Sequence, residues 1–276
     1  MRKIAFCNQK GGVAKTTSAL NIAAYLALLG KKTLLMDLDP QANATSGLGT
    51  DKAQVKHSIY DVLHEHLGLD EIILPTAIEL LSLAPSNINL TGAEIELVNT
   101  MGREICLKKA IQTLKREFDF IIFDCPPSLG LLTINGLTAA DSVIIPIQCE
   151  YYALEGLSQL LKTLDLVRDN LNAALEIEGV LMTLADYRTK LTKEVINEVK
   201  QYFGNDVYKA IIPRTIKLTE APGFGKPIAL YAPDSIGAKK YEEVAKEILG
   251  ISEITEHAEN KEDMITAEES HGKEAG

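Results

Sequence analysis

The sequence predicts an α/β fold: a doubly wound, mostly parallel sheet with helices on both faces. Short apolar runs alternate with amphipathic segments along most of the 276 residues, and these runs are apolar throughout rather than at every second position. Strands of that kind are typical of a parallel sheet covered on both faces. Right-handed crossovers then bring the carboxyl ends of the strands to one edge, where ligands bind.

The elements follow one another from the N-terminus. KIAFC (3–7) predicts the first strand, a glycine-containing loop follows, and a helix runs from about Lys15 to Leu29, where Gly30 ends it. The apolar runs predict further strands at 32–37, 118–124, 142–147, 176–185 and 209–213, with 79–85 as another candidate. Helical patterns lie near 93–117, 130–138, 153–171, 190–203 and 235–249.

The charge distribution divides the chain into a domain, residues 1–250, and an acidic tail, residues 251–276. The tail has eight acidic residues against two lysines, so it supplies −6 of the net charge of −10. Because it is also polar and aperiodic, we expect it to be disordered. Residues 186–226 carry eight basic against five acidic residues, a net of +3. The overall negative charge therefore does not exclude a local basic surface.

Composition excludes several classes of protein. No run of about 18 apolar residues exists, which argues against a membrane span, and the short apolar run near the N-terminus does not suit a signal peptide. The four cysteines are widely spaced and form no C-x-x-C pair. This pattern argues against a zinc site, a dithiol redox motif or a disulfide framework, and predicts buried, reduced thiols in the cytosol.

The stretch NQKGGVAKTT, residues 8–17, follows a strand and opens a helix, as a phosphate-binding loop does. Aligned on Lys15 and Thr16, the usual G-x-x-x-x-G-K-[ST] pattern asks for two glycines that this chain replaces by Gln9 and Ala14. A methyl group at position 14 is harmless if the backbone φ is negative and costs about 1 kcal/mol or more if it is positive.

The loop nevertheless has the groups that phosphate binding needs. Backbone amides at a helix N-terminus can hold phosphate oxygens, and Gly11 and Gly12 allow the backbone a close approach. Lys15 is placed to reach the β- and γ-phosphates, the Thr16 hydroxyl to bind magnesium, and Thr17 to donate to the α-phosphate.

Carboxylates end two of the expected neighbouring strands. Asp124 follows the apolar run FDFIIFD, where an aspartate can hold a magnesium-bound water. Asp37 ends the second strand and Asp39 follows it two positions later. One of the two can face a metal and the other an attacking water, although Asp39 before Pro40 is also a common turn sequence.

At this point the residues carry a family resemblance. The chain closely resembles the ParA/Soj family of partition ATPases, whose loop is called a deviant Walker A motif. The resemblance covers about residues 1–250 and rests on five motifs in order: KGGVAKTT (10–17), DLDPQANATSGLG (37–49), DCPPSLGLLTINGL (124–137), CEYYALEGLSQLL (149–161) and IPRTIKLTEAPGFGKPI (212–228).

The resemblance implies an ATPase that binds ATP and Mg²⁺. Lys15, Thr16 and Asp124 keep the roles argued above, Asp124 through a water. Asp39 matches the family position that orients the hydrolytic water. Lys10 matches the signature lysine that crosses a dimer interface to the partner's phosphates, so ATP would join two identical subunits. The implied contacts to the nucleotide from the loop are Lys10, Gly11, Gly12, Val13, Ala14, Lys15, Thr16 and Thr17.

The resemblance also implies contacts to the base and the ribose. Pro213 and Thr215 match positions that contact adenine in relatives, although the usual residue at position 215 is asparagine. Glu150, at the end of the fourth expected long strand, could reach the ribose across the dimer interface. Gln9 is the family's own residue at its position, so only Ala14 departs from the commoner loop.

Relatives of this loop do several jobs, and the sequence discriminates among them. Iron proteins of nitrogenase and iron–sulfur carrier ATPases need paired cysteines, and this chain has no pair with suitable spacing. MinD-like proteins bind membranes through a basic amphipathic C-terminal helix, whereas this tail is acidic and has no apolar stripe. Bacterial tyrosine kinases have a tyrosine-rich tail, whereas residues 251–276 of this chain contain no tyrosine. Arg188 and Lys217 match positions that contact DNA, although position 217 is usually arginine, and solvated surface charge is the plain alternative for both.

Two hypotheses stay open. In the first, the ATP-bound homodimer binds double-stranded DNA non-specifically, and a ParB-like centromere-binding protein triggers hydrolysis and release. The protein would then be cytoplasmic and nucleoid-associated, without a membrane partner. In the second, an ATPase of the same fold positions another cargo, mainly through protein contacts.

Overall fold

The computed structural model describes residues 1–64, 66–150 and 157–251. Residues Met1–Ala245 form one compact unit, and of the remaining chain only residues 246–251 are described. The expected boundary after residue 250 stays a prediction, since residues 252–276 of the tail lie outside the described part. The first residues of the helix expected at 153–171 also lie outside it.

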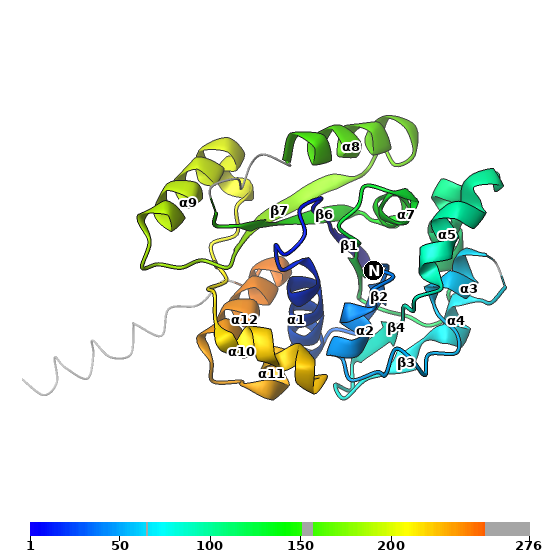
Figure 1. Cartoon of the computed structure of the whole chain (residues 1–276), viewed down its shortest axis with the longest axis horizontal. Helices are drawn as coiled ribbons and strands as arrows, with labels where there is room; N and C mark the ends of the chain where they lie inside the picture. The colour runs from blue at the N-terminus through cyan, green and yellow to red at the C-terminus, as the bar shows by residue number, and fades with distance from the viewer. Residues whose placement is uncertain (65, 151–156, 252–276) are drawn as a thin grey trace, which may run out of the picture. The chain divides into compact units, whose positions relative to one another are not determined.

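Within the described residues, the first unit is built on a seven-stranded sheet with the order β3-β4-β2-β5-β1-β6-β7 (Figure 1). Every neighbouring pair is parallel except β3 with β4. The predicted doubly wound, mostly parallel sheet is therefore confirmed. The strands are β1 (Arg2–Phe6), β2 (Thr33–Asp37), β3 (Leu74–Pro75), β4 (Leu81–Ala84), β5 (Phe120–Asp124), β6 (Ser142–Gln148) and β7 (Glu176–Thr183).

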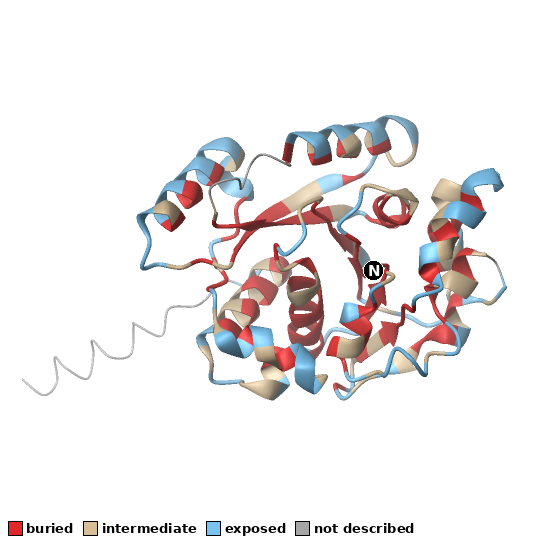
Figure 2. Cartoon of the chain, viewed as in Figure 1, coloured by how far each residue is buried: buried red, intermediate tan, exposed pale blue. Residues whose placement is uncertain are grey.

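Helices lie on both faces of the sheet. On one face, α1 (Lys15–Leu28) packs on β1, β2 and β5. On the other, α7 (Leu131–Ala139) packs on β1 and against α6 (Cys106–Gln112) and α8 (Leu157–Asn170). Successive residues of the central strands, such as Ile4 and Ala5, are fully buried, because both faces are covered (Figure 2).

The remaining helical segments are short, apart from two. They are α2 (Asn43–Gly47), α3 (Ile59–Leu63), α4 (Leu69–Ile72), α5 (Leu90–Glu96), η1 (Leu97–Asn99), η2 (Arg103–Ile105), α9 (Lys190–Phe203), η3 (Gly204–Asp206), α10 (Ile216–Glu220), η4 (Ala221–Phe224), α11 (Ile228–Tyr231) and α12 (Ile236–Leu249). None of the described helices is long and apolar enough to cross a membrane. All four cysteines are free and buried, as predicted.

The strand register aligns the ends of the three central strands. Asp37, the last residue of β2, is paired with Asp124, the last residue of β5, and Asp124 is paired with Phe6, the last residue of β1. Because these strands are parallel, the loop after β1 and the two carboxylates lie at the same edge of the sheet. The fold therefore brings together residues that are more than a hundred positions apart.

The strand expected at 209–213 is wrong. Residues 207–213 run beside β7, but they form only isolated bridges, Val180 with Val207 and Ala185 with Pro213. Pro213 has no N–H to donate, so the pairing cannot continue through it as a regular ladder.

The single helix expected at 93–117 is also wrong. The chain forms α5, η1, η2 and α6 instead, with Gly102 between η1 and η2. Gly102 has a φ of 72°, a left-handed conformation that an α-helix cannot continue through. The short strand β3 had no signal in the apolar pattern, since it has only two residues.

Candidate functional site

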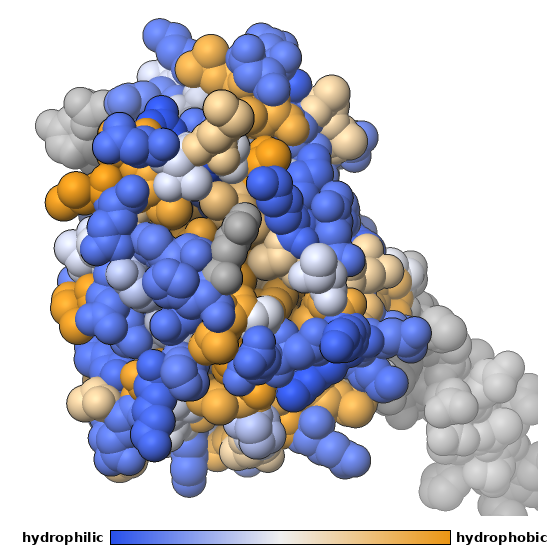
Figure 3. Space-filling model, turned by 90° about the vertical axis from the view of Figure 1, so that its right-hand side faces the viewer, coloured by the Kyte–Doolittle hydropathy of each residue, from blue (hydrophilic) through white to orange (hydrophobic). Residues whose placement is uncertain are grey.

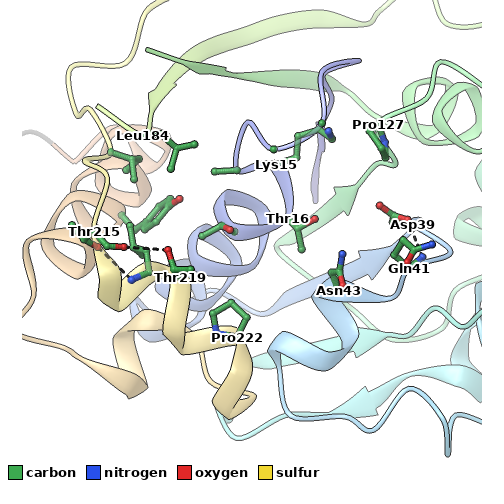
Figure 4. Close-up of a pocket in the computed structure, with 17 residues that line it drawn as sticks. Lys15, Thr16, Asp39, Gln41, Asn43, Pro127, Leu184, Thr215, Thr219 and Pro222 are labelled. Atoms are coloured by element: carbon green, nitrogen blue, oxygen red, sulfur yellow. Dashed lines mark hydrogen bonds between the residues drawn. The ribbon is translucent and has the colours of Figure 1, made fainter. Parts of the chain in front are cut away.

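A cavity of about 470 Å³ opens where the loop after β1 meets the aligned strand ends. Lys15 and Thr16 lie in its middle (Figure 4). One side of it holds Asp39, Gln41, Asn43 and Pro127, and the other holds Leu184, Thr215, Thr219 and Pro222 (Figure 4). Of the residues predicted for the site, eight line this cavity: Gly11, Gly12, Ala14, Lys15, Thr16, Thr17, Asp39 and Thr215.

Contacts to neighbouring strands hold the loop in place. The Asn8 side-chain amide donates to the Pro146 carbonyl at 2.7 Å, and the Asn8 side-chain oxygen accepts from the Lys10 amide at 3.0 Å. The buried Thr183 hydroxyl, at the end of β7, lies 3.0 Å from the Val13 carbonyl and 3.2 Å from the Ile147 carbonyl. The predicted residues Lys10 and Val13 thus take part through their backbone, and Val13 is itself buried.

Ala14 has a positive φ, the conformation in which its methyl group is costly. Its φ is 62° and its ψ is 33°, a left-handed backbone that side chains other than glycine adopt rarely. Ala14 forms the N-cap of α1, and its carbonyl accepts from the Ser18 amide at 2.9 Å. The glycine of the commoner pattern would suit this position better, and the loop carries backbone strain here.

Lys15 is buried against the strand ends. Its ammonium donates to the Lys10 carbonyl at 3.1 Å, so the side chain folds back across the loop. Burial lowers the pKa of Lys15, while the neighbouring Asp124 carboxylate acts in the opposite direction. A cation in this position can bind an anionic group of a ligand held by the loop.

Asp124 is fully buried, and among the described residues neither of its carboxylate oxygens has a hydrogen-bond partner in good geometry, although the Thr16 hydroxyl lies close enough to lower its pKa. Burial and the neighbouring carboxylates, Asp37 above all, raise the pKa of Asp124 well above its usual range, and Thr16 and Lys15 act in the opposite direction. Buried carboxylates normally have partners, because an unpaired one is costly. Two free oxygens beside the Thr16 hydroxyl therefore fit a hydrated Mg²⁺, which would supply the missing positive charge and donors.

Asp37 and Asp39 have separate tasks. One oxygen of Asp37 accepts from the amide and the hydroxyl of Thr45, at 2.8 and 2.7 Å, and the other accepts from the Asp39 amide at 3.1 Å. Asp37 therefore anchors α2 to the strand end, and burial raises its pKa to about 6. Asp39 lines the cavity, and one of its oxygens accepts from the Gln41 amide at 2.9 Å.

The residues expected at the base and the ribose are only partly brought together. Thr215 lines the cavity and caps α10, where its hydroxyl accepts from the Leu218 amide at 3.3 Å. Pro213 is buried in the bridge to Ala185 and does not line the cavity. Glu150 does not line it either and forms an ion pair with Arg214 at 2.9 Å.

The two basic residues expected at DNA are exposed and lie outside the cavity. Both nitrogens of the Arg188 fork contact Asp186, at 2.8 and 2.6 Å, and this contact lowers the pKa of Asp186 to about 2. Lys217 pairs with Glu220 at 3.1 Å and lies 5.5 Å from the centre of the Tyr231 ring. Their side chains are 87% and 55% exposed, so an anion can reach both.

Sequence reasoning missed half of the cavity wall. Some of the missed residues stand inside the quoted motifs, so closer reading of those motifs could have found them: Gln41, Asn43, Pro127, Ile212, Leu218, Thr219 and Pro222. Two others, Leu184 and Tyr241, had no such signal. Leu184 has a φ of 53°, and Tyr241 is fully buried with its hydroxyl 3.1 Å from the Ser18 hydroxyl.

Comparison with known proteins agrees with this geometry. A family model described as an AAA domain matches residues 1–177. The chain is 58% identical over 245 residues to the sporulation initiation inhibitor protein Soj of Bacillus subtilis (strain 168), covering 89% of this chain and 97% of that protein. It is 50% identical over 248 residues to the chromosome partitioning protein ParA of Myxococcus xanthus (strain DK1622), covering 90% and 88% respectively.

A solved structure is similar over the same region. Cobyrinic acid a,c-diamide synthase from Mycobacterium smegmatis, crystallised with ADP and magnesium, is 40% identical, with a TM-score of 0.80 over 90% of this chain and 94% of that one. The fold, the phosphate-binding loop with its aligned carboxylates, and the identity to the Soj and ParA proteins agree. The chain belongs to the ParA/Soj family of chromosome-partitioning ATPases.

Proposed function

We propose that this chain is an ATP-dependent switch for DNA segregation. Its ATP-bound homodimer binds double-stranded DNA non-specifically, and a ParB-like centromere-binding protein stimulates hydrolysis and release. The observation that carries the ATPase half is the cavity itself, where Lys15, Asp39 and the unpaired Asp124 surround one phosphate-binding loop. The similar synthase structures hold ADP, or an ATP analogue, together with magnesium, which supports ATP and Mg²⁺ as the ligands here.

The residues have distinct roles in this proposal. The backbone amides of the loop hold the phosphates, and Lys15 neutralises the β- and γ-phosphates. Thr16 binds Mg²⁺, and Asp124 accepts from a water on that ion. Bound Mg²⁺ neutralises charge on the phosphates. Asp39 orients the attacking water. Thr215, on the opposite side of the cavity, contacts the adenine base.

Dimerisation follows from Lys10. Within the described residues the Lys10 ammonium has no hydrogen bond or ion pair, whereas the Lys10 carbonyl accepts from the Lys15 ammonium. A loop lysine that is free to extend can neutralise the phosphates of a second copy, as an arginine finger does in other nucleotidases. ATP would then be the bridge between two protomers, and dimerisation would depend on it.

DNA binding by the dimer rests on Arg188 and Lys217. DNA phosphates can replace Asp186 and Glu220 as their partners, and a dimer presents each residue twice, which multiplies the weak individual contacts. Because such contacts are to the backbone, we expect no sequence preference. A nucleoid-associated location in the cytoplasm follows from this proposal.

The deciding experiment is a titration of labelled duplex of arbitrary sequence with ATP, ADP or no nucleotide. We expect ATP to raise the affinity, and Arg188→Ala to lower it roughly tenfold because two phosphate contacts are lost per dimer. Lys15→Ala, which removes productive ATP binding, is the control. If ATP leaves the affinity unchanged, the protein is instead an ATPase of this family that positions another cargo through protein contacts.

A further inference from the structure

A second cavity, of about 440 Å³, lies directly beside the nucleotide cavity and is lined from α1, α2, η4 and the loops that follow α2 and η4. α2 contacts both α1 and η4, and α1 and α2 lie side by side in Figure 1. Four residues line both cavities: Thr16, Thr17, Asn43 and Pro222. Thr16 lies between Asn43 and Pro222 in Figure 4, so the first turn of α1 is a wall that the two cavities share.

The second cavity has an excess of positive charge. Lys52 and Lys226 line it, and among the described residues no aspartate or glutamate does. The Lys226 ammonium has no hydrogen bond or ion pair within the described part of the chain. The Lys52 ammonium donates to the Gln41 carbonyl at 2.9 Å, which leaves two of its three N–H groups for another acceptor. Two cations with free donors favour an anion that has several acceptor oxygens, as a phosphate group has.

The rest of the wall suits the body of a small organic molecule. Leu20 and Ala221 are buried apolar side chains of this wall, and Thr17 and Asn43 add a hydroxyl and an amide. Apolar walls with a few polar groups are typical of ligand sites of this volume. Figure 3 shows a contrasting surface on the side that carries α3 and α5, where apolar patches stand between hydrophilic side chains and Ile95 is 77% exposed.

The walls of the second cavity are held together without a ligand. The buried Asn21 amide donates to the Thr17 carbonyl at 2.8 Å, and its side-chain oxygen accepts from the Ile228 amide at 2.7 Å. The loops after α2 and η4 touch at Gly49 and Gly225, where a methyl group added to Gly225 would lie 2.7 Å from the Gly49 Cα. A ligand would therefore enter a preformed site, which lowers the entropic cost of binding.

One chain of contacts leads from this cavity to the proposed water-orienting carboxylate. Lys52 holds the Gln41 carbonyl, and the Gln41 amide donates to Asp39 at 2.9 Å. An anion that draws the Lys52 ammonium toward itself competes with the Gln41 carbonyl and thus acts on the segment that positions Asp39. Because binding energies are reciprocal, occupancy of one cavity affects the other through these contacts and the shared turn of α1.

We propose that the second cavity is a regulatory site for a small phosphate ester with a planar body, which binds while the nucleotide is in place and slows hydrolysis. Lys52 and Lys226 would bind the phosphate, and the apolar wall would cover the ring. The regulatory half of this inference rests on the proposed function, since it uses the role given there to Asp39. The binding half depends on the second cavity alone.

The binding test uses the full chain with excess ADP and Mg²⁺, so that the nucleotide cavity is filled and no turnover occurs. The probe is pyridoxine 5′-phosphate, a planar phosphate ester whose ring fluorescence reports binding. We expect saturable binding of one probe per chain, and none of unphosphorylated pyridoxine, which lacks the anion.

Variants then locate the probe. Lys226→Glu should weaken its binding roughly tenfold or more, the effect of losing one charge-assisted hydrogen bond, whereas Lys226→Arg should retain it. Lys162→Glu is the matched control, because Lys162 is an exposed lysine of α8, which packs against α7 on the other face of the sheet. The melting temperatures of the three variants should match that of the parent. Saturating probe should also lower the ATP turnover of the parent but not that of Lys226→Glu.

Each contrary result overturns a stated part. Absence of saturable binding, or an equal loss in Lys162→Glu, removes the second cavity as a ligand site. Displacement of the probe by further ADP would place it in the nucleotide cavity, and displacement by duplex DNA would make the two lysines a DNA surface; either result overturns the proposal. Unchanged turnover at saturating probe overturns its regulatory half. If the parent hydrolyses no ATP, the proposed function fails, while the binding titration still decides the site.

Discussion

Replacing Ala14 by glycine should stabilise the protein, although it removes a methyl group. At a φ of 62° an L-residue is strained by about 1–2 kcal/mol relative to right-handed backbone, and glycine is not. Glycine also makes the unfolded chain more flexible, which offsets about 0.4–1 kcal/mol of that relief. The difference is a gain of about 0.5–1 kcal/mol in the free energy of unfolding, or about 2 °C in Tm for a chain of this size.

The assay is urea unfolding of the nucleotide-free protein, followed by far-UV circular dichroism, for the parent and Ala14→Gly. Ala110→Gly is the matched control, because Ala110 is also partly buried but lies within α6. There glycine should destabilise by about 0.5–1 kcal/mol, the opposite sign. ATP affinity of Ala14→Gly should stay within a few-fold of the parent. If Ala14→Gly is no more stable than the parent, or if its ATP affinity changes greatly, the strain argument fails.

Four other substitutions probe the site. Asp124→Asn should raise the free energy of unfolding of the nucleotide-free protein by about 1–3 kcal/mol at neutral pH in denaturant titrations. Since the folded-state pKa of Asp124 is raised, its carboxyl destabilises the fold increasingly as the pH rises from the unfolded-state pKa to the folded-state pKa, and has no such effect below both. The gain in Asp124→Asn must therefore shrink in acid, and nucleotide binding should lose its Mg²⁺ dependence. Thr183→Val should cost about 1–2 kcal/mol in the same titration and weaken ATP binding, because the Val13 carbonyl loses its buried donor; unchanged ATP affinity would exclude this support for the loop. Asp39→Ala should form an ATP dimer that binds DNA without turnover, and a parental hydrolysis rate would rule out its water-orienting role. Lys10→Ala should stay monomeric with ATP in light scattering, whereas an ATP dimer would refute the bridging lysine.

Much of the fold and the site could be predicted because the signals are contiguous. The apolar strands of a doubly covered sheet are visible as runs, and β1, β2, β5, β6 and β7 lie where the runs predicted them. The phosphate-binding loop is a single stretch between β1 and α1, so its residues are neighbours in the chain and in space. Asp124 could be placed beside it because parallel strands end at one edge.

The wrong predictions arose where local pattern and tertiary contacts disagree. Residues 209–213 are as apolar as a strand, but they lie at the irregular margin of β7 and form only a bridge at Pro213. Residues 93–117 have a helical pattern throughout, but the turn at Gly102 directs α6 onto α7. In both places the chain follows the packing available to it rather than its local preference.

By itself, the sequence determined the doubly wound sheet, the family, and the loop and carboxylates on which the proposed ATPase chemistry rests, because these depend on short motifs and on the geometry of parallel strands. Only the tertiary structure decided how those groups are used. The sequence does not distinguish the roles of Asp37 and Asp39. In the structure Thr45 donates to Asp37, whereas Asp39 lines the cavity. Leu184, which follows β7, and Tyr241 of α12 complete the cavity wall. Glu94 of α5 lies against Gly130 at the start of α7. Such contacts join segments far apart in the chain, and burial, hydrogen bonding and backbone strain there are set by packing that no local pattern encodes.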